Sequence, residues 1–340
     1  MPLSQPRVTA FCDKMLRSEM RALLHAKCAC GILLPDRELP MFDTTPQLNC
    51  AGRLLRLDGP QVMGIVNVTP DSFSDGGQHT TVDAAVAHGL RLVAEGAAVL
   101  DVGGESTRPG ASAVSLEEEL QRVIPVIQAL SAQTDVPISV DTYKPEVMRA
   151  AVAAGAGMIN DVHALRSPGA LEAAAELAVP VVLMHAPSAP HAMQAEPYYD
   201  DVVAEVHRFL AERIFAAEMA GIDKRRLILD PGFGFDKSTV HNLTVLAQLQ
   251  RLQEFGLPVL AGFSRKRTIG ELTGRQVAAD RVHGSVAAHL IAAQQGAQLL
   301  RVHDVAATVD ALKVWRAVAA IPTPRVAAPA APTIRWPDED

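Results

Sequence analysis

The stretch VMGIVNVTPDSFSDGG (62–77) contains the unit from which most of the chain is built: an apolar run that stops at Asn67, followed by small and polar residues. From Val62 onward, short apolar runs of this kind alternate with Ala-rich segments. The runs are 62–68, 98–103, 137–142, 157–162, 180–185, 226–231, 258–264 and 297–304. Because they are continuous rather than alternating, they are typical of parallel strands that are covered on both faces.

The segments between the runs are predicted to be helices. Residues 81–97 carry apolar side chains at three-four spacing and meet Gly96 at their end, whereas 115–132 open with Ser115 as an N-cap and acids in the first turn. Two further segments follow the same pattern: 285–297 and 305–318. Eight strand–helix units over about 250 residues favour a single (β/α)8 TIM barrel. The alternative is a doubly wound open sheet, which the lack of a clear reversal in strand order disfavours.

The two ends of the chain differ from this body. Residues 1–46 show no strand–helix rhythm and are predicted to be an irregular N-terminal extension. Residues 321–340 are rich in Pro and Ala and are predicted to be a disordered tail. The barrel is therefore expected to span 47–320.

Composition excludes some function classes. The chain of 340 residues is 49% apolar but only 4% aromatic, and its net charge of −7 argues against a nucleic-acid-binding surface. No segment approaches the length of a membrane span.

All four cysteines lie in the first fifty residues, and the C-x-C pair Cys28 and Cys30 has no second pair to complete a zinc site. The cysteine-free remainder is compatible with a reducing cytoplasm.

Polar side chains gather where the runs end, and in a barrel these ends share one rim. Taken singly, each has an ordinary structural interpretation, such as a helix N-cap or a packed histidine. Taken together they form two sets. The first suits a flat heterocycle rich in N–H donors and consists of Asp141, Asn160, Asp230 and Lys266. The second suits phosphate oxygens and consists of Asn67, Thr107, Arg108, Arg301 and His303. The Asn67 carbonyl could also ligate Mg²⁺. These residues alone predict a heterocyclic substrate that carries a phosphate or diphosphate.

Seven motifs then occur in an order that resembles the dihydropteroate synthase family of folate biosynthesis. They are NVTPDSFSDGG (67–77), DVGGESTRPGA (101–111), VDT (140–142), IND (159–161), DPGFGF (230–235), SRK (264–266) and RVHD (301–304). The resemblance covers roughly residues 47–320. It implies a transferase that condenses p-aminobenzoate with 6-hydroxymethyl-7,8-dihydropterin diphosphate, with the barrel fold, Mg²⁺, a homodimer and a cytoplasmic location. Sulfonamides, which mimic p-aminobenzoate, are expected to compete at such a site.

The resemblance also implies roles for individual residues. The first polar set resembles the pterin-binding residues, and Asn67 the residue at the diphosphate–Mg²⁺ site. Arg301 and His303 resemble the residues that bind the pterin and its anion. Loop residues are expected to assist closure over the substrates, namely Phe73, Asp75 and Arg108, and Thr107 is expected to bind substrate. The p-aminobenzoate pocket is expected to consist of Phe73, Pro109, Phe233, Ser264 and Arg267. No covalent nucleophile is expected.

The chain departs from the family pattern at two places. Arg267 stands where many relatives have Ser, so it either contacts the p-aminobenzoate carboxylate or points to solvent. The segment MHAPSAP (184–190) replaces a loop that tends to read like MHMQGTP. Three rival functions are a corrinoid-dependent methyl-transfer module, an inactive pterin-binding protein, and an aldolase or isomerase barrel in which Lys266 forms a Schiff base.

Overall fold

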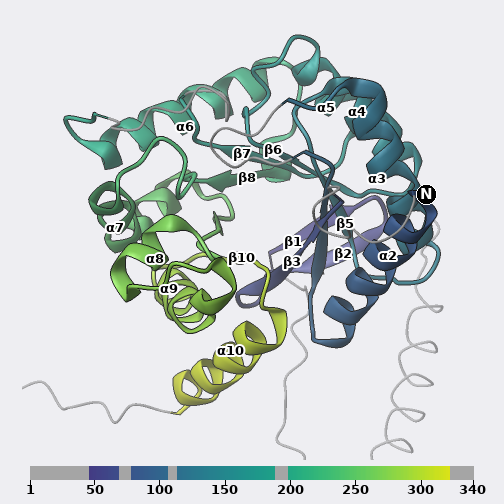
Figure 1. Cartoon of the computed structure of the whole chain (residues 1–340). Coiled ribbons are helices and arrows are strands. Elements are labelled where there is room, and N and C mark those ends of the chain that lie inside the picture. The colour runs from purple at the N-terminus through teal and green to yellow at the C-terminus, as the bar shows by residue number, and fades with distance from the viewer. Residues whose placement is uncertain (1–45, 69–77, 106–112, 188–197, 322–340) are drawn as a thin grey trace, which may run out of the picture. The chain divides into compact units, whose positions relative to one another are not determined.

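The eight apolar runs form the parallel strands of one sheet within the residues that the computed structural model describes, which are 46–68, 78–105, 113–187 and 198–321. Helices surround this sheet (Figure 1). The strands are β3 (Gln61–Asn67), β4 (Val99–Gly103), β5 (Ile138–Asp141), β6 (Met158–Asp161), β7 (Val181–Met184), β8 (Leu227–Asp230), β9 (Leu260–Ala261) and β10 (Leu299–Val302).

The sheet closes into a barrel. Its order is β8-β7-β6-β5-β4-β3-β10-β9, and a parallel bridge between Leu229 and Val259 joins the two ends. This closure confirms the (β/α)8 prediction and excludes the doubly wound sheet. Strand β9 is shorter than the expected run 258–264, because the chain leaves the sheet after Ala261 and the Phe263 amide donates to His289 Nε2 at 3.1 Å instead.

The helices begin and end close to the predicted residues. They are α2 (Gln78–Ala94), α3 (Leu116–Ser131), α4 (Pro145–Ala153), α5 (Ala170–Leu177), α6 (Val202–Met219), α7 (Thr239–Ala247), α8 (Arg267–Thr273), α9 (Val282–Gln294) and α10 (Val305–Ala319), with 3-10 turns η4 (Lys224–Arg226), η5 (Leu249–Phe255) and η6 (Ala278–Arg281). Ser115 caps α3 as predicted, since its side chain accepts from the Glu118 amide at 3.2 Å. Helix α2 ends before the predicted residue 97 because Gly96 takes φ of 102°, which favours glycine.

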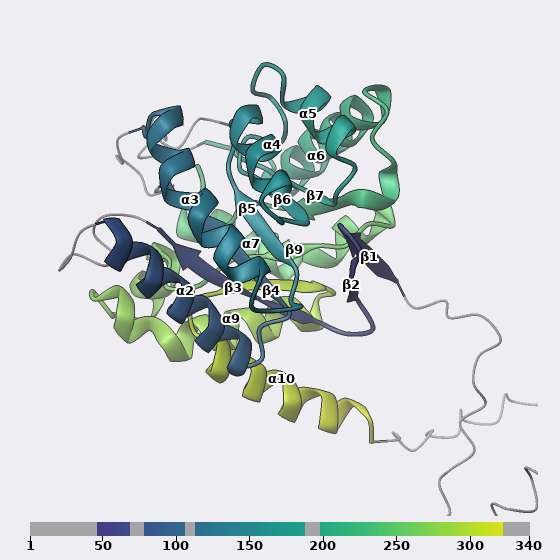
Figure 2. The same cartoon turned by 90° about the vertical axis from the view of Figure 1, so that its right-hand side faces the viewer.

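A hairpin that was not predicted covers the end of the barrel where the strands begin (Figure 2). It pairs β1 (Gln47–Cys50) with β2 (Arg53–Arg56) through a turn in which Ala51 and Gly52 both have positive φ. Its buried side chains, Leu48, Cys50, Leu55 and Leu57, form one apolar cluster with Met63, Val99, Met158, Val182, Ile228, Leu260 and Leu299 of the barrel strands. The floor of the barrel is therefore closed and apolar.

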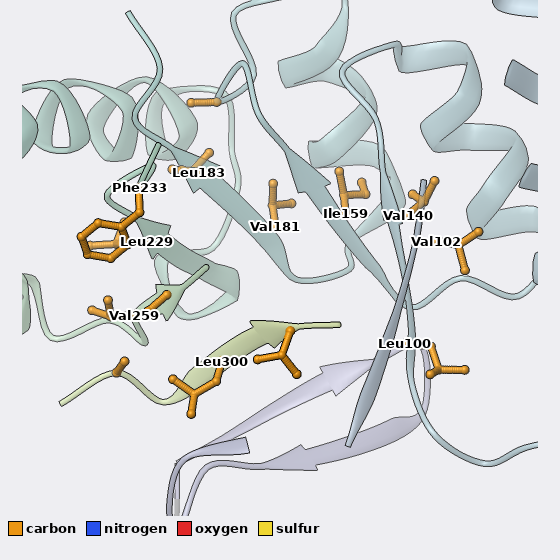
Figure 3. Packing of buried hydrophobic residues seen from close by; sticks show 14 of the residues in the cluster. Leu100, Val102, Val140, Ile159, Val181, Leu183, Leu229, Phe233, Val259 and Leu300 are labelled. Carbon is orange, nitrogen blue, oxygen red and sulfur yellow. The ribbon is translucent and has the colours of Figure 1, made fainter. Parts of the chain in front are cut away.

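Side chains along the strands alternate between the helices and the barrel interior. On β4, Leu100 and Val102 belong to the large cluster that packs against the helices (Figure 3), whereas Asp101 between them pairs with Arg301 of β10. The interior is thus apolar at the floor and polar toward the carboxyl ends of the strands, so that polar side chains are presented at one end of the barrel. The predicted domain limits at 47 and 320 stay predictions, because the flanking segments lie outside the described residues.

Candidate active site

One cavity at the carboxyl ends of the strands gathers most of the predicted polar residues. Its lining includes the expected residues Asp141, Asn160, Asp230, Ser264, Lys266, Arg301 and His303. It also includes residues that were not singled out from the sequence: Ile65, Val162, Met184, Phe235 and Gly262. Met184, Val162 and Phe235 form a small apolar cluster with Ala186, and Tyr143 packs against it. The cavity therefore has a charged side and an apolar wall, which suits a flat, polar ring.

Arg301 binds two carboxylates at once inside the barrel. Its Nε lies 2.6 Å from Asp101 Oδ2, and its Nη2 lies 2.7 Å from Asp141 Oδ2. Burial lowers the pKa of Arg301, but the two carboxylates outweigh burial and raise it. Burial raises the pKa of Asp141, and the Arg301 charge opposes that rise. The cluster carries one net negative charge when both acids are ionised, so Arg301 is already neutralised before any anion binds.

Asp101 is the residue of this cluster that sequence reasoning missed as part of the site. It is completely buried, and its Oδ2 accepts from both Arg301 and Asn160 Nδ2, the latter at 3.0 Å. Its Oδ1 has no hydrogen-bond partner among the described residues. Asp101 thereby fixes the orientation of two side chains that line the cavity. The two-residue period of a strand could have revealed it, because Asp101 then points inward between the outward side chains of Leu100 and Val102.

Asp230 and Lys266 form the second charged part of the cavity. The Gly232 amide donates to Asp230 Oδ1 at 2.7 Å, and burial raises the pKa of Asp230. Burial lowers the pKa of Lys266 to about 8, although the Asp230 charge opposes that shift. Lys266 Nζ donates to the Phe233 carbonyl and lies 4.8 Å from the centroid of the Phe235 ring. A carboxylate and an ammonium thus lie together, ready to bind the donor and acceptor edges of one heterocycle.

His303 is held by Ser264. Ser264 Oγ accepts from the His303 amide at 3.0 Å and lies 2.9 Å from His303 Nδ1. The Ser264 hydroxyl can donate its own proton to Nδ1, and in that arrangement the ring carries its proton on Nε2. Ser264 and Lys266 are separated by Arg265, which has φ of 57° and forms a bidentate ion pair with Asp304. This turn places the residues on both sides of Arg265 on the cavity.

The remaining predicted residues lie elsewhere or outside the described parts of the chain. Asn67 is the last residue of β3, half-buried and beside Gly103 of β4. The Phe233 ring is 1% exposed and packs on Phe263 with centroids 3.9 Å apart. The Arg267 side chain is 79% exposed, and its Nε lies 2.6 Å from Glu271 Oε1. Five predicted loop residues lie outside the described segments: Phe73, Asp75, Thr107, Arg108 and Pro109.

The oxygen donors near the cavity fit a metal ion only if the substrate supplies most of its ligands. Within the described segments, no group of three or more His, Cys, Asp or Glu side chains is arranged to hold a metal ion. Asn67 offers a single neutral oxygen at the strand end. A Mg²⁺ ion often binds through one or two protein oxygens together with substrate phosphates and water. The residues therefore fit a Mg²⁺ that arrives with a phosphorylated substrate.

Comparisons with known proteins agree with this geometry. The family described as "Pterin binding enzyme" matches residues 63–303. The chain is 54% identical over 271 residues to the dihydropteroate synthase of Escherichia coli (strain K12), which covers 80% of this chain and 96% of the relative.

Two solved structures of Xanthomonas albilineans dihydropteroate synthase extend the likeness. The complex with 4-aminobenzoic acid is 74% identical with a TM-score of 0.79, and the complex with 7,8-dihydropteroate is 72% identical with a TM-score of 0.75. Each covers 82% of this chain and 100% of the solved chain. Among the described helices, none is long and apolar enough to cross a membrane.

Proposed function

Because this chain belongs to the dihydropteroate synthase family of pterin-binding enzymes, which are transferases, we propose that it joins p-aminobenzoate to 6-hydroxymethyl-7,8-dihydropterin diphosphate. The products are 7,8-dihydropteroate and diphosphate, and the reaction belongs to folate biosynthesis. One observation carries the proposal: residues from five strand ends that are far apart in the sequence line one cavity, namely Asp141, Asn160, Asp230, Lys266 and Arg301.

In this proposal, each side of the pterin ring meets a matched group. The carboxylates of Asp141 and Asp230 accept from the ring N–H and amino groups, and Asn160 supplies an amide. Lys266 donates to a ring carbonyl or nitrogen. Arg301 orients Asp141 and presents the face of its guanidinium to the ring, since its Nε and Nη2 already bind carboxylates. The apolar wall around Phe235 and Met184 covers the other face of the ring.

We propose that the substitution is dissociative. The bond between the pterin methylene carbon and the diphosphate oxygen breaks first, and the electron pair leaves with diphosphate. The electron-rich dihydropterin stabilises the positive charge at that carbon. The amine lone pair of p-aminobenzoate then forms the new carbon–nitrogen bond, and the amine proton is released. Because the leaving group and the ring supply the driving force, the protein contributes positioning and electrostatic stabilisation rather than a nucleophile.

The diphosphate is proposed to lie near the ends of β3 and β10, which are neighbours in the barrel. His303 Nε2–H donates to its oxygens, and Asn67 would hold a Mg²⁺ ion at this side of the cavity. Bound Mg²⁺ neutralises the charge that develops on the leaving group. Thr107 and Arg108 complete this side in the proposal, and Phe73, Asp75 and Arg108 assist closure that excludes water. Phe73, Pro109, Phe233, Ser264 and Arg267 are proposed for the p-aminobenzoate pocket.

We further propose that the protein is a homodimer and acts in the cytoplasm. Exposed apolar side chains on the described surface support an interface between copies. Three of them lie on neighbouring segments: Leu272 of α8 is 55% exposed, Val277 just before η6 is 60% exposed, and Ile291 of α9 is 44% exposed. Sedimentation of the purified protein over a range of concentrations would establish the oligomeric state.

The function is tested by mixing purified protein with the pterin diphosphate and Mg²⁺, with and without p-aminobenzoate, and following both products. We expect dihydropteroate in the complete mixture, and slow protein-dependent diphosphate release when p-aminobenzoate is omitted. Pterin binding without any product would favour an inactive pterin-binding protein. Pterin binding that is indifferent to diphosphate and Mg²⁺ would favour the methyl-transfer class.

A further inference from the structure

A lysine that the reaction does not require is buried directly behind the cavity. Lys237 is 8% exposed, and its Nζ lies 2.8 Å from His185 Nδ1, 3.0 Å from the Gly232 carbonyl and 3.1 Å from the Phe235 carbonyl. A longer contact of 3.4 Å joins Nζ to the His185 carbonyl, so the three protons of the ammonium are shared among four acceptors. The ammonium of Lys237 therefore binds the neighbouring turn and one histidine rather than the substrate.

The turn that Lys237 holds is the one that builds the pterin cavity. It follows Asp230, and its Gly232 amide fixes one Asp230 oxygen. Its Phe233 carbonyl accepts from Lys266, and its Phe235 ring lines the cavity. Gly232 has φ of 68°, and a Cβ there would lie 2.0 Å from the His185 carbonyl oxygen. The turn thus packs tightly on the end of β7, where His185 lies.

A second side chain holds the same turn from the opposite direction. Asn242 of α7 accepts from the Gly234 amide at 2.8 Å and donates to Thr268 Oγ1 of α8 at 3.1 Å. Asn242 thus ties the turn to α8, which begins beside Lys266, whereas Lys237 ties it to β7. Lys237 is the side chain that binds the carbonyls of Gly232, whose amide holds Asp230, and of Phe235.

We infer that Lys237 is a positioning residue for the pterin site: its hydrogen bonds hold the 230–236 turn and keep the proton of His185 on Nε2, so that Asp230 and Phe235 meet the heterocycle. This inference rests on the proposed function, because it names what the turn is positioned for. Burial lowers the pKa of Lys237 to about 7, and the Asp230 charge opposes that shift. Burial and then the Lys237 charge lower the pKa of His185 to about 2, so this imidazole is neutral and accepts at Nδ1.

The test compares Lys237→Met with a matched control. Arg226→Met removes a cation that also donates to two backbone carbonyls, those of Ala174 and Val179, but at the opposite end of β8. We expect Lys237→Met to raise the Kd for a pterin, and the KM for the pterin diphosphate, by about tenfold to a hundredfold, as for a lost charged hydrogen bond. The KM for p-aminobenzoate should change less, because Phe233 is the one residue of this turn that is proposed for its pocket. The control should bind pterin like the wild type, and equal pterin affinity in Lys237→Met would overturn the inference.

A second measurement does not depend on whether the variant folds. Nitrogen-15 NMR of the wild-type protein should show His185 neutral, with the proton on Nε2 and none on Nδ1. A proton on Nδ1 would overturn the inference, because Lys237 Nζ could not then donate to that atom. If the wild type makes no dihydropteroate, the proposed function fails, while the pterin Kd and the tautomer still decide the role of Lys237.

Discussion

The Nη2 atom of Arg301 lies 2.7 Å from Oδ2 of Asp141, although the two residues are 160 positions apart and their strands are not neighbours in the sheet. The pair therefore crosses the barrel interior. Asp101 accepts from the same guanidinium, so Arg301 binds two buried carboxylates from two other strands. Such a cation connects the two sides of the barrel and fixes the charged side of the cavity.

Removing this cation should destabilise the fold. Arg301→Met leaves two buried carboxylates without their shared partner, and we expect a loss of about 3–5 kcal/mol in the free energy of unfolding. The exposed pair of Arg225 and Asp223, also at 2.6 Å, provides a matched control. Arg225→Met should change the free energy of unfolding little, because an exposed ion pair is weak. Urea denaturation of both variants measures the difference, and equal losses would show that the buried cluster is not structurally important.

Asp141 and His303 are expected to bind different parts of the substrate. Asp141→Ala is expected to weaken binding of pterin and of pterin diphosphate alike by about 1.5–3 kcal/mol, as for a lost charged hydrogen bond. His303→Ala should weaken only binding of the diphosphate ester, because its proposed contact is with the anion. Calorimetric titration with the two ligands separates the effects. If His303→Ala weakened the binding of pterin and of pterin diphosphate equally, the assignment of His303 to the diphosphate would be wrong.

Pterin affinity should fall at alkaline pH through Lys266. Its folded-state pKa is lowered to about 8 from an ordinary value of 10.5, so the ammonium is present below about 8 and is lost as the pH rises through that value. A bound ring carbonyl favours the protonated form, so the midpoint should lie higher in the complex than in the free protein. Lys266→Arg keeps its charge over this range, because a guanidinium does not titrate there, and should lose the part of the pH dependence that is centred near 8. Pterin Kd values that stay constant across the range in the wild type would contradict this role.

The barrel could be predicted from sequence because eight continuous apolar runs leave few arrangements for strands covered on both faces. The same continuity concealed Asp101, which lies within the predicted run 98–103 and belongs to β4 but was not among the candidate site residues. The role of Lys237 could not be predicted, because its partner His185 lies 52 residues earlier and no local pattern connects them. The hairpin at 47–56 was missed because each strand has only four residues, and its burial depends on the barrel floor that it covers.

That hairpin gives a stability prediction away from the active site. A Cβ on Gly157 would lie 2.4 Å from the Cys50 carbonyl oxygen, and this backbone cannot move without shifting the hairpin. Gly157→Ala should therefore cost about 1–3 kcal/mol, as other overpacked sites do. Gly59→Ala is the control, since its nearest neighbour is the end of the Arg316 side chain at 3.4 Å. Thermal unfolding should separate the two, and a Gly157→Ala variant as stable as the control would show that the hairpin is loosely packed.

Whether Arg267 binds p-aminobenzoate can be tested by removing its ion-pair partner, Glu271. The two side chains are paired at 2.6 Å on the exposed start of α8, so Glu271 competes with any p-aminobenzoate carboxylate for the same guanidinium. Glu271→Gln should tighten p-aminobenzoate binding by about 0.2–1 kcal/mol, the usual strength of an exposed pair, and Arg267→Ala should weaken it. Glu118→Gln, which breaks a pair of the same i,i+4 spacing with Arg122 on α3, controls for the loss of a surface charge. If the KM for p-aminobenzoate is the same in all three variants, Arg267 points to solvent and does not belong to the pocket.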